Sequence, residues 1–345
     1  MAMKVKELYV YPIKSLRATP LTEATVTKHG FTYDRRFMLL KVHPDHYQNM
    51  AVSNFPQMTR FLTSITYSKN SDDKAGKIAV TFIPPQTVGS KSKASTIEIP
   101  LLPETSDLRV FQVTMHRSPT NAYIMPDRFN EWFSSCFDFP VILAYLGGNL
   151  RSVLFEDMKP AEKPSSSSWF SSITNKLPIS VLGSSAPQDD PDDGERITFA
   201  DCASYLITSQ TSLEDVSSRL PAGINMDITK FRPNIVVSGS PTAWEEDFWG
   251  ELSIGKASFR CLHNCVRCKS INIDYRTGQP AEDEEGNVLK KLQKDRRVDS
   301  GHKYSPVFGR YAFLGSGDGG SIKIGDEVTV TKVNEDRTVF SWKLQ

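Results

Sequence analysis

The sequence has no hydrophobic run long enough to cross a membrane. A transmembrane helix needs about 18 or more apolar residues, whereas the longest apolar runs here, such as residues 37–40, have the length of a strand. The N-terminal residues MAMKVKELYVYPIKS also lack the apolar core of a signal peptide. We therefore expect no integral membrane segment and a cytoplasmic location.

The chain also has almost no net charge and no framework of paired cysteines. Its 41 Lys and Arg residues balance 40 Asp and Glu residues, so no overall field attracts a nucleic acid. The five cysteines are odd in number, and no secretion signal precedes them. We therefore expect no nucleic-acid partner and reduced thiols rather than disulfides.

What the sequence does contain is a series of short strand patterns. A length of 345 residues predicts about two domains, and the first ~125 residues alternate apolar and polar positions between turn-forming stretches. The candidate strands of this part are residues 5–10, 36–40, 61–67, 78–83, 96–99 and 108–113. Apolar residues at helical spacing from Phe129 to Phe137 predict one helix, with Cys136 on its buried face.

The character of the sequence changes near residue 150 and again near residue 196. Residues 151–195 are rich in Ser, Pro and Asp, and Trp169 and Phe170 stand alone among serines. Further strands are predicted at 235–237, 251–254, 257–261, 271–274, 311–314, 322–324 and 327–333. A Thr211-x-x-Glu214 capping box predicts a helix that ends at Leu220, and residues 281–302 read as a long loop. We predict three parts: a β-rich domain at 1–148, an insertion at 149–195 and a second β-rich domain at 196–345.

Three cysteines within eight residues form the strongest chemical signal: Cys261-Leu-His263-Asn-Cys265-Val-Arg-Cys268. A structural zinc site is one interpretation, although such sites usually take two separated pairs of ligands. A Cys-x-x-Cys redox dithiol is another, although a strand pattern rather than a helix follows Cys268. A third is a single thiolate at a strand end, favoured by Arg267 and Lys269, that binds a soft metal. Inert structural cysteines are the fourth.

The neighbourhood of Cys268 resembles the Arg-Cys element of the MOSC family, the type of domain that ends molybdenum cofactor sulfurases. Four further motifs match in order, and together they cover nearly the whole chain outside the serine-rich insertion. The motifs are Tyr11-Pro-Ile-Lys-Ser15 with Tyr33-Asp-Arg-Arg-Phe37, Phe231-Arg-Pro-Asn-Ile-Val-Val237, Ser305-Pro-Val-Phe-Gly-Arg-Tyr311 and Ile324-Gly-Asp-Glu-Val328. The chain is most similar to the mitochondrial amidoxime reducing component family and its bacterial relatives. The resemblance implies a predominantly β, α+β fold of two barrel-like subdomains with a few helices.

The resemblance also implies a molybdenum cofactor held between the two subdomains. The position that matches the family's metal ligand and catalytic cysteine is Cys268. The positions that match the family's cofactor contacts are Lys14, Ser15, Arg36, Asp201, Cys202, Arg232, Asn234, Arg267 and Tyr311. One motif departs from the family, which typically reads Ser-Asp-Thr-Ser where this chain reads Ala200-Asp201-Cys202-Ala203.

The function that the resemblance implies is a molybdenum-dependent oxidoreductase that reduces N-hydroxylated compounds of the amidoxime and hydroxamate type. Electrons would come from partner proteins, in eukaryotic relatives a cytochrome b5 and its flavin reductase. The alternative is a carrier or storage protein for the cofactor, or a sulfur-transfer module with a persulfide on Cys268 or Cys265. The chain contains no pyridoxal phosphate domain to supply that sulfur. Because the relatives are mitochondrial, association with the mitochondrion is the alternative location.

Overall fold

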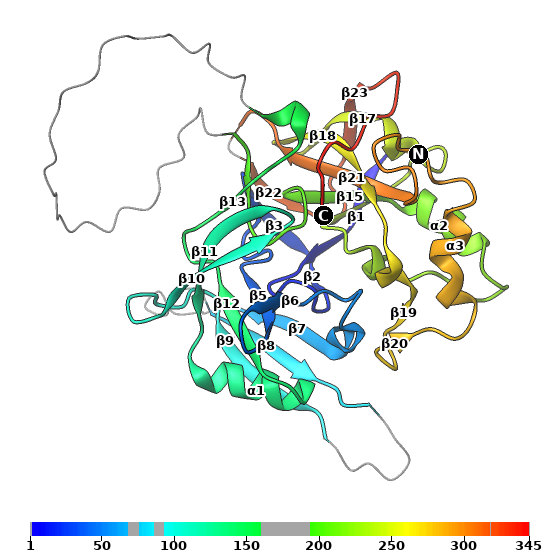
Figure 1. The fold of residues 1–345 in the computed structure, drawn as a ribbon. Coiled ribbons are helices and arrows are strands. Elements are labelled where there is room, and N and C mark those ends of the chain that lie inside the picture. Colours follow the sequence, from blue (N-terminus) through cyan, green and yellow to red (C-terminus); the bar gives the residue numbers. More distant parts are fainter. Residues whose placement is uncertain (1, 68–75, 86–92, 160–193, 318, 345) are drawn as a thin grey trace, which may run out of the picture.

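The largest sheet of the fold draws its strands from both ends of the chain (Figure 1). The computed structural model describes residues 2–67, 76–85, 93–159, 194–317 and 319–344. In spatial order the sheet contains β2 (Thr19–Leu21), β1 (Lys4–Val10), β16 (Ile235–Ser238), β15 (Tyr205–Ser209), β21 (Val307–Leu314), β18 (Ala257–Val266), β17 (Trp249–Ile254) and β23 (Val328–Val333). The β15–β16 pair is parallel and the other pairs are antiparallel.

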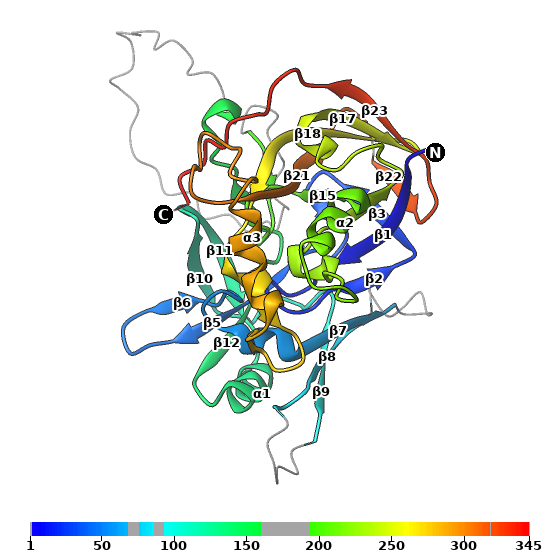
Figure 2. The same cartoon turned by 90° about the vertical axis from the view of Figure 1, so that its right-hand side faces the viewer.

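Two smaller sheets come from the first 150 residues and lie on the other side of the molecule (Figures 1 and 2). The five-stranded sheet contains β10 (Val110–Met115), β11 (Ser118–Ile124), β12 (Val141–Tyr145), β5 (Phe37–Val42) and β6 (Tyr47–Asn49). The three-stranded sheet contains β7 (Phe61–Thr66), β8 (Lys77–Phe82) and β9 (Ser95–Pro100). Helix α1 (Asp127–Phe137) packs its buried face, Phe129, Phe133 and Phe137, into the core that these two sheets share.

The remaining elements are short. A second three-stranded sheet contains β22 (Gly320–Lys323), β3 (Glu23–Thr27) and β4 (Gly30–Phe31), and two small pairs join β13 (Arg151–Ser152) with β14 (Arg196–Ile197) and β19 (Ile273–Asp274) with β20 (Gln279–Pro280). The other α-helices of the described residues are α2 (Gln210–Ser218) and α3 (Val288–Leu292). These elements confirm the predicted fold class of mostly strands in two curled sheets with few helices.

Three local predictions were wrong. The predicted strand at 271–274 is a 3-10 turn, Lys269–Asn272, followed by the two residues of β19. The predicted loop at 281–302 contains α3, where Val288 and Leu292 at helical spacing are buried. Helix α2 begins at Gln210, one residue before the capping box, and its N-cap Ser209 makes no capping hydrogen bond.

The start and end of the predicted insertion are part of the fold. Arg151 and Ser152 pair with Ile197 and Arg196, so the chain leaves and re-enters the structure side by side. Residues 160–193, with Trp169 and Phe170, lie outside the described residues. No helix in the described part of the chain is both long and apolar enough to span a membrane.

Candidate functional site

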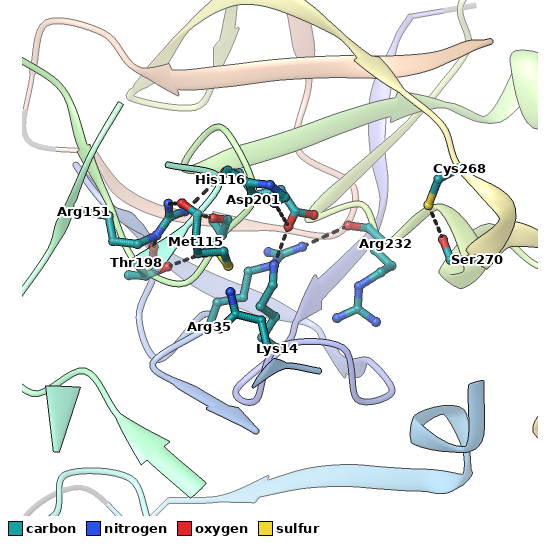
Figure 3. Close-up of polar contacts among 12 residues, drawn as sticks. Lys14, Arg35, Met115, His116, Arg151, Thr198, Asp201, Arg232, Cys268 and Ser270 are labelled. Atoms are coloured by element: carbon teal, nitrogen blue, oxygen red, sulfur yellow. Dashed lines mark hydrogen bonds and ion pairs between the residues drawn. The ribbon is translucent and has the colours of Figure 1, made fainter. Parts of the chain in front are cut away.

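Cys268 is the exposed thiol at the end of a long buried strand. Strand β18 ends at Val266, and Cys268 precedes the 3-10 turn at Lys269–Asn272. Its Sγ lies 3.2 Å from the Ser270 hydroxyl (Figure 3). Of the five cysteines only Cys268 is exposed. A thiol in this position is open to a ligand from solvent, as the third interpretation of the cysteine cluster requires.

The neighbouring cysteines are in a different environment. Cys261, Cys265 and Cys202 are buried, and burial raises the pKa of each thiol, that of Cys261 to about 12. All five cysteines are free, so Cys265 and Cys268 form no disulfide. Within the described ranges no three His, Cys, Asp or Glu side chains gather as a metal site would require.

Lys14 and His116 converge on one oxygen of Asp201. The Lys14 ammonium forms an ion pair with Asp201 Oδ1, and His116 Nε2 lies 3.3 Å from the same atom (Figure 3). Burial opposes ionisation of Asp201, but Lys14 and the His116 hydrogen bond outweigh it and hold the pKa of Asp201 well below its ordinary value. The Lys14 side chain is 9% exposed and that of Asp201 51%. A carboxylate anchored on one side thus faces solvent on the other.

The loop that carries Asp201 is held by a fully buried arginine. Arg151 donates from Nη1 to the carbonyl of Met115 at 2.9 Å and from Nε to that of Thr198 at 3.1 Å. Its Nη2 donates to the carbonyls of Ala200 and Asp201. Since one guanidinium ties the loop to the end of β10, the position of Asp201 is fixed before any ligand binds.

Two more arginines lie over the ring of Tyr11. The guanidinium carbons of Arg35 and Arg232 are 4.7 and 4.3 Å from the ring centroid. Arg35 pairs with the buried Asp34 and donates to the carbonyl of Arg232 at 3.2 Å. Cation–π contacts of this kind lower the cost of placing two like charges together. Figure 3 shows Arg35 next to Lys14, and Arg232 between Lys14 and Cys268 in this view.

This cluster leaves two buried donors without partners. Arg232 donates from Nη1 to the carbonyl of Leu16 at 2.8 Å, but its buried Nη2 and the buried hydroxyl of Tyr11 have no hydrogen-bond partner in the described structure. An unmade hydrogen bond at a buried donor costs about 1–3 kcal/mol. With the cations Lys14, Arg35, Arg151 and Arg232 against the carboxylates Asp34 and Asp201, the site suits an anion rich in acceptor oxygens.

The other residues proposed from the sequence fall into two groups. Cys202, Tyr311 and Ser15 are buried near the cluster: Ser15 follows Lys14, and Asp201 acts electrostatically on Cys202 and Tyr311. Arg36, Asn234 and Arg267 instead use their side chains within the fold. Arg36 donates to the carbonyl of Gly147, Asn234 accepts from the Leu206 amide at 3.1 Å, and Arg267 donates to the carbonyls of Phe308 and Phe231.

Five residues of the cluster were not among the site residues proposed from the sequence: Tyr11, Asp34, Arg35, His116 and Arg151. Arg35 had a signal, because it stands in the same motif as Arg36. The backbone decides between the two: Arg35 has a left-handed φ of 51° that turns it inward. His116 and Arg151 had no signal, since their partners lie 85 and 36 to 50 residues away.

Two other hollows lie apart from this cluster. One, of about 780 Å³, surrounds the C-terminal end of α2 between Gln210 and Met226. The other, of about 340 Å³, lies between Lys28, Asp157 and Arg260. The first hollow has Glu214 as its only charged lining residue, and none of its lining residues belongs to the cluster or to the segment around Cys268.

Comparison with known proteins defines the class. The model of the MOSC N-terminal β-barrel domain matches residues 2–140, and the MOSC domain model matches residues 194–329. The chain belongs to the proteins that combine these two domains. It is 28% identical to mitochondrial amidoxime reducing component 2 of Bos taurus over 94% of this chain and 82% of the relative.

Two further similarities accompany this match. The chain is 26% identical to the molybdenum cofactor sulfurase of Oryza sativa subsp. japonica over 81% of its length, which is 30% of the sulfurase. The solved structure of the YuaD protein of Bacillus subtilis aligns with 95% of this chain and 94% of its own at 10% identity, with a TM-score of 0.31. The name of the rice relative refers to the molybdenum cofactor, and that of the bovine relative refers to amidoxime reduction.

Proposed function

We propose that this protein binds the molybdenum cofactor between its N-terminal barrel and its MOSC domain and reduces N-hydroxylated compounds with it. The observation that carries the proposal is an excess of buried positive charge with unpartnered donors, together with an exposed cysteine at a strand end, and Cys265 interacts electrostatically with both Asp201 of that cluster and Cys268. The match to the MOSC domain model and the name of the rice relative support the choice of cofactor. The bovine relative alone supports the choice of reaction and a mitochondrion-associated location.

The residues present fit such a group. The cofactor is a pterin with a dithiolene and a phosphate, so it needs cations at one end and hydrogen-bonding groups at the other. Lys14 and Arg232 supply charge, and the free donors at Arg232 Nη2 and the Tyr11 hydroxyl would be satisfied by acceptor oxygens. The solvent-facing Oδ2 of Asp201 accepts hydrogen bonds from pterin nitrogens. We assign Arg36, Asn234 and Arg267 to holding the backbone around the site.

Cys268 provides the protein ligand. When bound, the cofactor supplies a molybdenum centre that exchanges two electrons and an oxygen atom with the substrate. Cys268 holds that centre at the strand end, where its exposure leaves room for a small substrate. Cys265 and Tyr311 are buried together in one hydrophobic core. Electrons come from partner proteins, for which we propose a cytochrome b5 and its flavin reductase.

Elemental analysis of two cysteine variants tests the proposal. Protein expressed in a host that makes the cofactor should contain molybdenum and pterin, and should reduce benzamidoxime with an artificial electron donor. Cys268→Ala should lose the metal and the activity. Cys136→Ala, which removes a half-buried thiol on α1, is the matched control and should retain both. Zinc without molybdenum in the wild type, or full metal content in Cys268→Ala, contradicts the assignment.

A second candidate function is cofactor storage or sulfur transfer, favoured by the 81% of this chain that matches the sulfurase. In that case Cys268 bears a persulfide or holds intact cofactor without turnover. The same preparations separate the two functions. Bound pterin without reduction of benzamidoxime indicates storage, and cyanide-labile sulfur that disappears in Cys268→Ala indicates sulfur transfer.

A further inference from the structure

The C-terminal residues 338–342, which lie beyond the residues that the MOSC domain model matches, form a strap that reaches the β10–β11 turn beside the candidate site. Each of these five residues is held by a different segment of the chain. Thr338 accepts from Arg310 Nη1 at 2.7 Å, and the carbonyl of Val339 lies 3.1 Å from His263 Nδ1. The amide of Phe340 donates to Asp299 at 3.0 Å, and Ser341 Oγ donates to Asp157 at 2.6 Å. Trp342 Nε1 donates to the carbonyl of His116 at 2.9 Å.

The strap also contributes to a hydrophobic core. Phe340 and Trp342 are each 3% exposed and meet the ring of Phe155 edge to face, at centroid distances of 5.1 and 5.3 Å. The same core contains Cys202 and Tyr311 of the candidate site. Figure 2 shows the chain descending from β23 to the hairpin of β10 and β11, where it ends. The strap is therefore packed against the site and fixed at Trp342.

The residue that Trp342 holds is at a strained turn. His116 and Arg117 connect β10 to β11 in a two-residue hairpin, and both have left-handed φ values, 51° and 66°. Asn and Gly usually occupy such positions because a larger side chain costs stability there. Two hydrogen bonds stabilise the turn: Arg151 to the carbonyl of Met115 and Trp342 to that of His116. The strain and the two bonds together fix where the His116 ring points.

The ring of His116 points at Asp201. Both His116 Nε2 and the Lys14 ammonium contact Oδ1, and no described residue hydrogen-bonds Oδ2. Two donors on one oxygen set the rotation of the carboxylate, so that Oδ2 faces away from them. Losing one donor would let the carboxylate rotate about the remaining contact.

We propose that His116 is a positioning residue for Asp201, and that Trp342 in the C-terminal strap fixes His116 in that role. The inference rests on the proposed function in one respect, since Asp201 is taken to bind the pterin. In the apoprotein the inference depends only on the contacts of His116 with Trp342 and Asp201. Residues 342, 116 and 201 are far apart in the sequence but adjacent in space. Trp342 donates to the backbone carbonyl of His116, and the side chain of His116 contacts Asp201.

The first experiment uses the apoprotein and needs no cofactor. Nitrogen-15 NMR follows the imidazole of His116, assigned by its absence in His116→Gln. Trp342→Phe keeps an apolar ring in the core but removes the Nε1 donor, and Asp201→Asn removes the charge that His116 contacts. Both should move the His116 signal. Ser341→Ala is the matched control within the strap, because it loses the contact with Asp157 and none with His116. A signal that Trp342→Phe leaves unchanged overturns the inference.

The second experiment measures how fast pterin leaves the purified holoprotein, by fluorescence of the released pterin. Trp342→Phe should speed release about two- to tenfold, the range expected for one lost hydrogen bond. His116→Ala should speed it similarly, and adding Trp342→Phe to His116→Ala should change nothing further. His116→Gln, which retains a side-chain N–H donor, should restore slow release, and Ser341→Ala should match the wild type.

The outcomes separate the inference from the proposed function. Additive effects of Trp342→Phe and His116→Ala show that the strap acts on stability only, and this overturns the inference. If the apoprotein shows the NMR coupling but binds no pterin, the proposed function fails while the positioning of Asp201 by His116 stands. If pterin binds and the coupling is absent, the proposed function stands and the inference fails.

Discussion

The ammonium of Lys14 and the carboxylate of Asp201 form an ion pair across 187 residues of sequence. Lys14 belongs to the segment that matches the N-terminal barrel domain, and Asp201 to the segment that matches the MOSC domain. Strand β1 of the first segment also pairs with β16 of the second in the eight-stranded sheet. The candidate site therefore forms only when both segments fold together, and its central contact is electrostatic.

Replacement of Lys14 tests that contact. Lys14→Met should lower the free energy of unfolding by about 1–2 kcal/mol, less than the ~3–5 kcal/mol for breaking a fully buried pair, because Asp201 is half exposed and remains close to His116. The same variant should retain less pterin, since a cation of the site is gone. Urea denaturation and pterin content measure the two effects.

The control for Lys14→Met is Lys77→Met. The pair of Lys77 with Glu98 lies on the surface of the three-stranded sheet at 2.9 Å, with both side chains about 60% exposed. Exposed pairs contribute about 0–1 kcal/mol, so this variant should change stability little and pterin content not at all. Equal losses in the two variants would show that Lys14 has no special role.

Removing the unpartnered hydroxyl of Tyr11 should not destabilise the apoprotein, whereas replacing Lys14 should. Tyr11→Phe keeps the ring over which Arg35 and Arg232 lie but removes a buried hydroxyl without a hydrogen bond. The apoprotein should therefore be as stable as the wild type or more stable, by up to about 1 kcal/mol. If the hydroxyl binds the cofactor, the holoprotein should lose that gain and release pterin faster. Thermal unfolding with and without cofactor checks this, and a destabilised apoprotein would mean that the hydroxyl has a partner.

The sequence motifs located residues of the candidate site better than they predicted how those residues are arranged. Cys268, Lys14 and Asp201 stand in recognisable motifs, and the structure places Lys14 and Asp201 in contact and Cys268 at an exposed strand end. Arg36 was proposed as a cofactor contact, whereas Arg35, its neighbour in the same motif, was not. The left-handed φ at Tyr33 and Arg35 turns Arg35 inward, and no periodicity in the sequence encodes it.

The contacts that sequence reasoning missed are those between distant segments. Apolar alternation predicted a strand at 108–113, which corresponds to β10 before the His116 turn, because that signal is local, but it did not predict β11 after the turn. The bond from Trp342 to His116 joins residues 226 positions apart, and single-sequence patterns carry no information on such pairs. The helix α3 was missed for a different reason: it is five residues long, too short for a period of 3.6 to be visible.

Reactivity toward alkylating agents should single out Cys268. It is the one exposed thiol of the five, whereas burial raises the pKa of Cys202, Cys261 and Cys265 and so depletes their thiolates. Under native conditions iodoacetamide should label Cys268 first, as seen by peptide mass spectrometry, and bound metal should protect it. Labelling of Cys265 at a similar rate would show that the end of β18 opens in solution.

The last prediction concerns Glu246, whose carboxyl lies in the interior. Its Oε2 accepts from Ser212 at 2.6 Å, while its buried Oε1 has no partner in the described structure. Burial raises the pKa of Glu246 from 4.5 to about 7. Between these pH values the folded protein keeps a proton that the unfolded chain has lost, so stability should fall as the pH rises from about 4.5 to 7, by about 3 kcal/mol at ~1.4 kcal/mol per pH unit.

Glu246→Gln mimics the protonated acid and should abolish that fall. The variant should match the wild type near pH 4.5 and exceed its stability above pH 7, as measured by urea denaturation across the pH range. Glu214→Gln, which removes an exposed carboxylate from α2, is the control and should keep the wild-type slope. If Glu246→Gln retains the full pH dependence, Glu246 is not its source.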